Sequence, residues 1–210
     1  MLEYALTCTE QPVPAQRRLI DATAALGQVS EMQVVHGQAV FLTVLTAAIG
    51  ARTVIEIGTF TGDSALAFAR GLAPGGVVDT YNVTDEWSQI ASRAWREAGV
   101  TDLIRQHIGN AADLLDELPQ ESFVNIAFID ADKVGYITYW EQLVPRMVDN
   151  GLILADNVLY YGDAVSPEAE GNAAAIRAFN EHVMADDRVQ PTMLPLADGL
   201  TIARKLPRPN

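Results

Sequence analysis

The sequence contains a single cysteine, Cys8, and only three histidines, which lie far apart. One cysteine cannot form a disulfide within the chain, and scattered histidines lack the ligand spacing that is typical of zinc sites. We therefore expect neither a disulfide framework nor a zinc ion.

Long apolar runs are also missing. No stretch approaches the roughly 20 apolar residues that a membrane-spanning helix requires. No basic segment at the N-terminus leads into an apolar run and a small-residue cleavage site, as it would in a secretory signal. These two absences predict a cytoplasmic protein without a membrane partner.

Basic side chains are scarce, with 14 Lys and Arg against 27 Asp and Glu and a formal net charge of -13. Because contacts with phosphates depend on Lys and Arg, this balance opposes nucleic acids, transfer RNA included, and anionic membranes as partners. Solubility alone would also explain the acidity.

The chain is long enough for one sizeable core, since 49% of its 210 residues are hydrophobic. We predict a single domain, 1–210, in which N-terminal helices (1–51) precede an α/β core (52–205). Within 1–51, helix-like segments span about 13–26 and 36–49. The segment 162–171, which contains Ser166-Pro167 and three acidic residues, is expected to be mobile.

From residue 52 onward, short apolar runs alternate with helix-like segments, a pattern typical of a mostly parallel sheet flanked by helices. The predicted strands are 53–57, 77–81, 103–108, 124–129 and 152–155. The predicted helices are 63–71, 87–98, 111–117, 136–148 and 169–185, the first of them capped by Asp63 or Ser64. Residues 190–196 and 200–205 predict a hairpin around Asp198-Gly199, which gives the sheet an antiparallel end.

The turn after the first predicted strand lacks two glycines that a nicotinamide fingerprint requires. A fingerprint starting at Gly58 would need glycine at two positions that hold Phe60 and Asp63. The carboxylate of Glu56 would repel a pyrophosphate but favour the amino and sulfonium groups of S-adenosylmethionine. The turn therefore disfavours a nicotinamide oxidoreductase and indicates S-adenosylmethionine, although a plain strand-to-helix turn is the alternative interpretation.

Polar side chains follow two later strands. Asp130, Asp132 and Lys133 come after the strand 124–129, and Asp156-Asn157 ends the strand 152–155. Ligands bind beyond the carboxyl ends of parallel strands, and oxygen ligands suit a hard ion such as Mg2+. The alternative is ordinary turn chemistry and solvated surface pairs.

Lys133 is the candidate general base. A cation nearby and partial burial both favour the neutral amine, the form that accepts a proton. Coordination to a cation would also ease ionisation of a phenolic hydroxyl, as it does for metal-bound water. Metal and lysine together would generate a phenolate.

The runs 54–65, 128–133, 156–159 and 194–205 together resemble the cation-dependent O-methyltransferases, which include caffeoyl-CoA and catechol O-methyltransferases and small bacterial relatives. The resemblance extends from about Met32 to Lys205. It implies the Rossmann-like class I methyltransferase fold, with a seven-stranded, mostly parallel sheet, and commonly a homodimer.

The resemblance also implies a set of site residues. The metal ligands fall on Asp130, Asp156 and Asn157, and the proposed base falls on Lys133. Asn82 stands where an acidic residue usually binds the ribose, and its amide can still accept a hydrogen bond without charge assistance. The implied cofactor contacts are Val34, Glu56, Gly58, Thr59, Phe60, Ser64, Asn82, Ala111, Asp130, Asp132 and Tyr139.

Tyr160 and Tyr161 are the candidate substrate residues, because they stand where many relatives have a Trp followed by a small residue. They could stack on an aromatic substrate or pack under the loop 162–171. We expect an S-adenosylmethionine- and cation-dependent O-methyltransferase that acts on a small catechol-like or hydroxyanthranilate-like aromatic in specialised metabolism. The alternatives are a caffeoyl-CoA-type enzyme acting on an acyl-CoA and a non-catalytic scaffold.

Overall fold

The structure is a computed structural model that describes residues 2–207, with side chains from Tyr4 onward, so that Met1 and 208–210 of the predicted domain lie outside the described residues. Its seven strands follow the order β3-β2-β1-β4-β5-β7-β6. The pairs β2–β3, β1–β4 and β4–β5 are parallel, and β7 runs antiparallel to β5 and β6. These pairings confirm the predicted mostly parallel sheet with an antiparallel C-terminal hairpin.

The described chain divides into two compact units. The first unit runs to Arg52 and again from Thr59 to Ile108, and the second comprises Thr53–Gly58 and the residues from Gly109 onward. The division passes through the turn after β1, so the predicted cofactor turn contributes residues to both units. The single-domain organisation of 1–210 stays a prediction.

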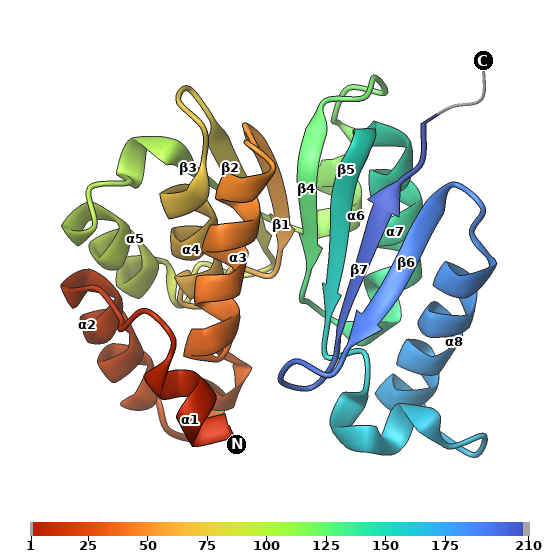
Figure 1. The fold of residues 1–210 in the computed structure, drawn as a ribbon, viewed down its shortest axis with the longest axis horizontal. Coiled ribbons are helices and arrows are strands. Elements are labelled where there is room, and N and C mark those ends of the chain that lie inside the picture. Colours follow the sequence, from red (N-terminus) through yellow and green to blue (C-terminus); the bar gives the residue numbers. More distant parts are fainter. Residues whose placement is uncertain (1, 208–210) are drawn as a thin grey trace. The chain divides into compact units, whose positions relative to one another are not determined.

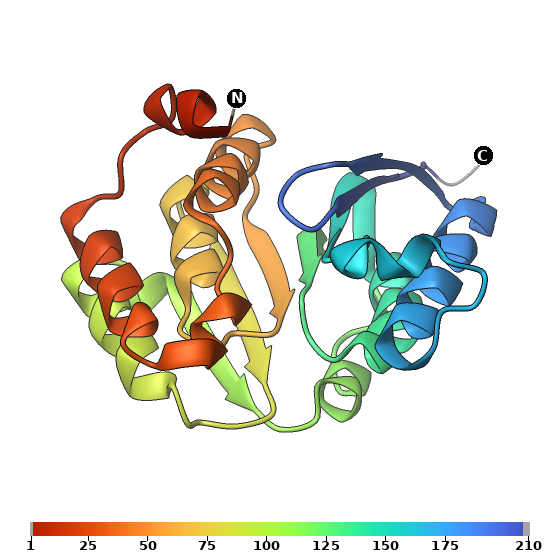
Figure 2. The same ribbon diagram turned by 90° about the horizontal axis from the view of Figure 1, so that it is seen from below.

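The first unit combines two strands with the N-terminal helices. Helices α2 and α5 lie side by side in both views (Figures 1 and 2). Its core includes α4, in which the five residues 65–69 are all buried. Its elements are α1 (Leu2–Thr7), α2 (Pro14–Ala24), η1 (Gly27–Met32), α3 (His36–Ala48), α4 (Asp63–Gly71), β2 (Val77–Asn82), α5 (Ser88–Glu97), η2 (Thr101–Leu103) and β3 (Ile104–Ile108).

The second unit holds the other five strands. Strand β4 is buried on both faces, as expected for a central parallel strand. The rings of Tyr136 and Trp140 each meet Phe179 of α8 edge-on, with centroids 5.3 and 5.6 Å apart. Its elements are β1 (Thr53–Ile57), α6 (Ala111–Asp116), β4 (Val124–Ile129), η3 (Lys133–Gly135), α7 (Tyr136–Leu143), η4 (Val144–Arg146), β5 (Met147–Asp156), η5 (Tyr160–Val165), α8 (Gly171–Ala185), β6 (Val189–Leu194) and β7 (Leu200–Lys205).

Two local predictions were wrong. The helix predicted over 136–148 ends at Leu143, and β5 already begins at Met147, because Pro145 cannot continue an α-helix and disfavours helical geometry in the residue before it. The predicted cap of α4 is also displaced, because Asp63 is its first residue and Gly62, at φ 83°, is the N-cap. Helices α1 and η1 were not predicted.

Within residues 2–207, no helix combines the length and apolar character needed to cross a membrane.

Candidate active site

The predicted base and two of the predicted metal ligands meet in the second unit. The Lys133 ammonium donates to Asn157 Oδ1 at 2.9 Å, to Tyr136 Oη at 2.6 Å and to Asp130 Oδ1 at 3.4 Å. A lysine ammonium has three protons, and here each has an acceptor. The carboxyl ends of β4 and β5 therefore gather oxygen atoms around one positive charge.

Asp156, the third predicted ligand, lies at the end of β5 and is buried. Its Oδ1 accepts a hydrogen bond from the backbone N–H of Asn157 at 2.8 Å. Its backbone carbonyl accepts one from the Tyr136 hydroxyl at 3.0 Å. Asn157 itself has a left-handed backbone, with φ 54°. The carboxylate of Asp156 thus belongs to the same local network as Lys133.

Tyr136 is a member of this network that the sequence analysis missed. Burial raises the pKa of its hydroxyl well above the ordinary value, and the carboxylates of Asp130, Asp156 and Asp132 add to the effect. The hydroxyl therefore stays neutral, so that it can accept from Lys133 and donate to Asp156 at once. The only available signal was its position three residues after Lys133, one helical turn away.

The donor set fits a hard divalent cation. Burial raises the pKa of the Asp130 carboxyl, and the nearby Lys133 ammonium opposes this shift. Two carboxylates and an amide provide only oxygen ligands, which suit Mg2+ rather than zinc. Among the described residues, no group of three or more His, Cys, Asp and Glu could hold a metal. In the predicted set the third ligand is an asparagine, and the metal site stays a prediction.

The second unit also contains the start of the predicted cofactor turn. Gly58 has φ 105°, and a Cβ placed there would lie 1.8 Å from the backbone oxygen of Asp130. The Asp130 N–H in turn donates to the Ile57 carbonyl at 2.8 Å. Only glycine is compatible with this close approach of β1 and β4. Glu56, one residue before Ile57, is fully buried.

Two further predicted cofactor residues contact each other. The Tyr139 hydroxyl donates to Asp132 Oδ1 at 2.6 Å, and the Gly135 N–H donates to Asp132 Oδ2 at 2.9 Å. Burial and the hydrogen bond to Asp132 both raise the pKa of Tyr139. Asp132 is therefore held in place by the chain that follows it.

Ala111, another predicted cofactor residue, is the first residue of α6, whose N-cap Asn110 accepts from two backbone N–H groups.

In the first unit, hydrogen bonds and ring packing hold the rest of the cofactor turn. The hydroxyls of Thr59 and Thr80 are 2.7 Å apart, and Trp95 Nε1 donates to the Gly62 carbonyl at 2.9 Å. Phe60 has a left-handed backbone with φ 46°, and its ring meets Trp87 edge-on at 4.9 Å. The turn is thus held in one conformation by β2, by α5 and by the residue that precedes α5.

Three further predicted cofactor residues of this unit, Asn82, Ser64 and Val34, lie outside the contacts that hold the turn. Asn82 ends β2, and its Nδ2 donates to the Thr84 carbonyl at 2.7 Å, which leaves Oδ1 as the accepting end of the amide. Ser64 is buried in the first turn of α4, and Val34 is half-buried between η1 and α3. The predicted cofactor residues are divided between the two units.

Asp63 plays a larger part than the helix cap that was predicted for it. Its carboxylate is buried and accepts from Gln16 Nε2 at 2.9 Å and Gln33 Nε2 at 3.5 Å. Burial raises the pKa of Asp63 to about 6, although the hydrogen bond from Gln16 opposes the shift, as do the charges of His36 and Arg70. The carboxylate links the cofactor turn to two N-terminal segments.

The predicted substrate residues lie in η5. Tyr160 and Tyr161 both have left-handed backbones, with φ 47° and 57°, and their ring centroids are 5.7 Å apart. Tyr160 is partly buried, and its hydroxyl accepts from Asn172 at 3.2 Å. Tyr161 is 80% exposed. Its ring is therefore available for contact with a ligand.

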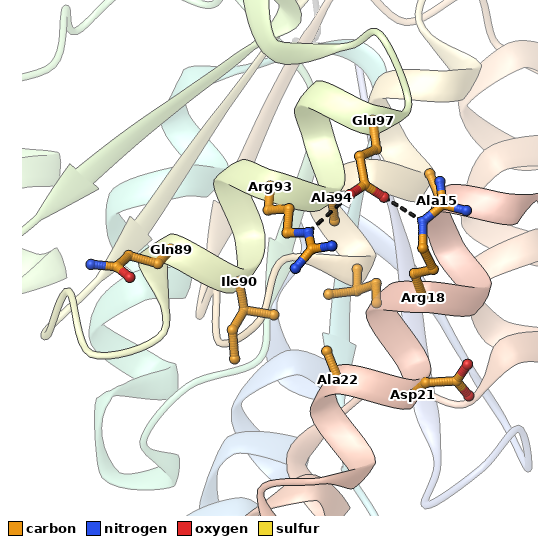
Figure 3. A pocket seen from close by; sticks show the side chains of 10 residues that line it. Ala15, Arg18, Asp21, Ala22, Gln89, Ile90, Arg93, Ala94 and Glu97 are labelled. Carbon is orange, nitrogen blue, oxygen red and sulfur yellow. Dashed lines mark hydrogen bonds and ion pairs between the residues drawn. The ribbon is translucent and has the colours of Figure 1, made fainter.

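A pocket of about 420 Å³ opens between α2 and α5 in the first unit. In Figure 3, Arg18 and Arg93 both reach Glu97, with ion-pair distances of 2.5 and 2.9 Å. None of the predicted site residues lines it. The lining residues are Ala15, Arg18, Leu19, Asp21, Ala22, Gln89, Ile90, Arg93, Ala94 and Glu97.

Comparisons with known proteins identify the family. The family model described as O-methyltransferase matches residues 8–206. The chain is 37% identical to "Probable caffeoyl-CoA O-methyltransferase 1" of Dictyostelium discoideum, over 98% of this chain and 92% of the relative. It is 32% identical to "Catechol O-methyltransferase domain-containing protein 1" of Mus musculus, over 97% of this chain and 79% of the relative.

The fold agrees with a solved structure of such an enzyme. The O-methyltransferase from Bacillus cereus in complex with SAH matches with a TM-score of 0.88 at 28% identity, over 97% of this chain and 96% of that chain. The family match extends over nearly the whole chain, from residue 8 to residue 206. The chain belongs to the O-methyltransferase family.

Proposed function

We propose that the protein transfers a methyl group from S-adenosylmethionine to a hydroxyl of a small catechol-like or hydroxyanthranilate-like aromatic, with a divalent cation, most simply Mg2+, as the second cofactor. The observation that carries the proposal is the contact of the Lys133 ammonium with both Asp130 and Asn157 at the ends of β4 and β5. A non-catalytic scaffold would have no need for this arrangement.

S-adenosylmethionine is the methyl donor of this proposal, and its cationic groups suit the carboxylates of Glu56, Asp130 and Asp132. At Gly58 the backbones of β1 and β4 approach so closely that only glycine fits, and a cofactor turn requires close backbone contacts of this kind. Asn82, with Oδ1 as its accepting end, would bind a ribose hydroxyl. The complex of the Bacillus cereus relative with SAH is consistent with this cofactor.

The cation would be held by Asp130, Asp156 and Asn157, where it would polarise the substrate hydroxyl and favour its ionisation. Lys133 would then take the hydroxyl proton, with Tyr136 and Asn157 holding its nitrogen in place. The exposed ring of Tyr161 would contact the aromatic substrate. A homodimer and a cytoplasmic location stay predictions.

A substrate series tests the proposal. Methyl transfer from S-adenosylmethionine in the presence of Mg2+ is measured for catechol, a hydroxyanthranilate, phenol and a catechol already methylated on one oxygen. We expect turnover of substrates that present two neighbouring ligand atoms, because both can bind the cation, and little turnover of phenol. Equal turnover of phenol and catechol would contradict the proposed chelation.

Caffeoyl-CoA belongs in the same series, because the similarity to "Probable caffeoyl-CoA O-methyltransferase 1" favours an acyl-CoA as the second candidate substrate. The net charge of -13 favours the free aromatic, since coenzyme A is itself an anion. A kcat/KM at least tenfold higher for caffeoyl-CoA than for every free catechol would assign the acyl-CoA substrate instead.

A further inference from the structure

The segment 157–161, which runs from the end of β5 into η5, has an unusual backbone. Asn157, Tyr160 and Tyr161 all have positive φ values, of 54°, 47° and 57°. Residues other than glycine seldom adopt this conformation, least of all bulky ones such as tyrosine. Such a backbone persists only where the surrounding structure holds it, and it is found most often at functional sites.

The turn of the β6–β7 hairpin provides the contacts that hold this segment. Asp198 Oδ1 accepts from the Tyr161 N–H at 2.7 Å, and the Asp198 carbonyl accepts from the Leu159 N–H at 3.0 Å. The Gly199 carbonyl accepts from the Val158 N–H at 3.1 Å. Three backbone donors of the strained segment are thus bonded to two adjacent residues of one turn.

The fit between the two segments is tight. A Cβ added at Gly199 would lie 2.6 Å from Leu159 Cγ, so the turn cannot move closer to the segment. Ala197, on the other side of Asp198, also has a left-handed backbone, with φ 50°. Left-handed residues therefore occur on both sides of this contact.

Burial of the Tyr161 side chain does not account for its backbone conformation. The side chain is 80% exposed, so this conformation does not serve to bury the ring. The same segment begins at Asn157, whose Oδ1 accepts from Lys133. A single strained segment therefore carries both a proposed metal ligand and a proposed substrate contact.

We propose that Asp198 is a positioning residue of the methyl-transfer site, which fixes the backbone of residues 157–161 and thereby the placement of Asn157 and Tyr161 for the aromatic substrate. This role rests on the proposed function. Asp198 acts through hydrogen-bond acceptance, so its negative charge is not required. An asparagine at this position keeps an accepting oxygen and should preserve the role.

The test compares the wild type with Asp198→Ala, Asp198→Asn and, as a matched control, Asp187→Ala, which removes an exposed carboxylate just before β6. Amide hydrogen exchange of residues 158–162 reports the contact directly and needs no enzyme activity. Steady-state kinetics then give the KM for the aromatic substrate, and calorimetry gives the Kd for S-adenosylhomocysteine.

For Asp198→Ala we expect faster exchange at Tyr161 and a KM raised about tenfold, since the hydrogen bond that holds the Tyr161 N–H is lost. The Kd for S-adenosylhomocysteine should not change. Asp198→Asn and Asp187→Ala should behave like the wild type within about threefold. If Asp198→Ala does not fold, Asp198→Ser replaces it, because serine suits a turn but is too short to reach the Tyr161 N–H.

Unchanged exchange at Tyr161 in Asp198→Ala would overturn the proposed contact. Faster exchange with an unchanged KM would overturn the positioning role, as would an Asp198→Asn variant as impaired as Asp198→Ala. A wild type that transfers no methyl group would refute the proposed function itself, and the exchange data would show separately whether the hairpin holds the segment.

Discussion

The Lys133 ammonium donates a hydrogen bond to Asn157 Oδ1 at 2.9 Å, across 24 residues of sequence. This contact joins the proposed base to a proposed metal ligand. Asp130 and Tyr136 accept the other protons of the same ammonium, so all three of its donors are engaged by side chains at the ends of β4 and β5 and in the first turn of α7.

Lys133→Arg tests whether Lys133 acts as a base or only as a positive charge. Arginine keeps the charge and several donors but is not deprotonated in proteins. If Lys133 is the general base, kcat should fall by about 100-fold or more in both Lys133→Arg and Lys133→Met. Turnover by Lys133→Arg within about threefold of the wild type would leave Lys133 a purely electrostatic role.

Asp156→Asn tests the metal ligands. The substitution keeps the side-chain shape and an oxygen that can accept from the Asn157 N–H, but it removes one negative charge from the site. We expect the Mg2+ concentration that gives half-maximal methyl transfer to rise at least about tenfold, because carboxylates are the strongest ligands of this hard cation. Asp149→Asn, an exposed aspartate on the same strand, is the control and should leave the Mg2+ dependence unchanged.

Gly58→Ala tests the close approach at the cofactor turn. The added Cβ would meet the Asp130 carbonyl oxygen, so the free energy of unfolding should fall by about 3 kcal/mol or more, and cofactor binding should be lost. Gly75 also has a positive φ, of 80°, but a Cβ there has no neighbour within 4 Å. Urea denaturation of Gly75→Ala should show a loss of only about 1–2 kcal/mol. Equal losses in the two variants would mean that the backbone conformation alone decides the effect.

Asp63→Asn tests the buried carboxylate of the first unit. Burial raises the pKa of Asp63 from 3.8 to about 6 in the folded state. Between these two pH values the folded state holds a proton that the unfolded state has released, so the free energy of unfolding falls as pH rises through the window. Above about pH 6 the ionised carboxylate therefore destabilises the fold, by about 3 kcal/mol for a shift of this size.

The stability of Asp63→Asn relative to the wild type should accordingly be higher at about pH 7.5 than at about pH 4.5, by roughly 2 kcal/mol in urea denaturation. Asp21→Asn, at an exposed position of α2, should show no such difference. The account of Asp63 fails if the stability difference between Asp63→Asn and the wild type is the same at both pH values.

The strands that the sequence predicted best are the buried ones. The bounds 53–57 and 124–129 agree with β1 and β4 because both are mostly apolar runs without an exposed face. The first half of β5 was missed because Asp149 and Asn150 are exposed and polar, so that this part of the strand has the composition of a loop. Such a segment becomes a strand only through its pairing partners.

The candidate site shows the same division between local and long-range information. Strand ends followed by Asp or Asn were sufficient to predict that Asp130 and Asn157 lie close together, because parallel strands end at a common edge. The contacts of Tyr136 with Lys133 and of Asp198 with Tyr161 could not be predicted in this way. The first depends on the exact start of a helical turn, and the second joins residues that are 37 apart in sequence.

Cation dependence of methyl transfer tests the central claim most directly. The protein is treated with EDTA, and the transfer of methyl groups from S-adenosylmethionine to a catechol is measured before and after Mg2+ is restored. We predict that EDTA abolishes turnover and that Mg2+ restores it, with Asp156→Asn requiring more Mg2+ than the wild type. Turnover that is the same in EDTA and in Mg2+ would contradict the proposed role of Asp130, Asp156 and Asn157 as metal ligands.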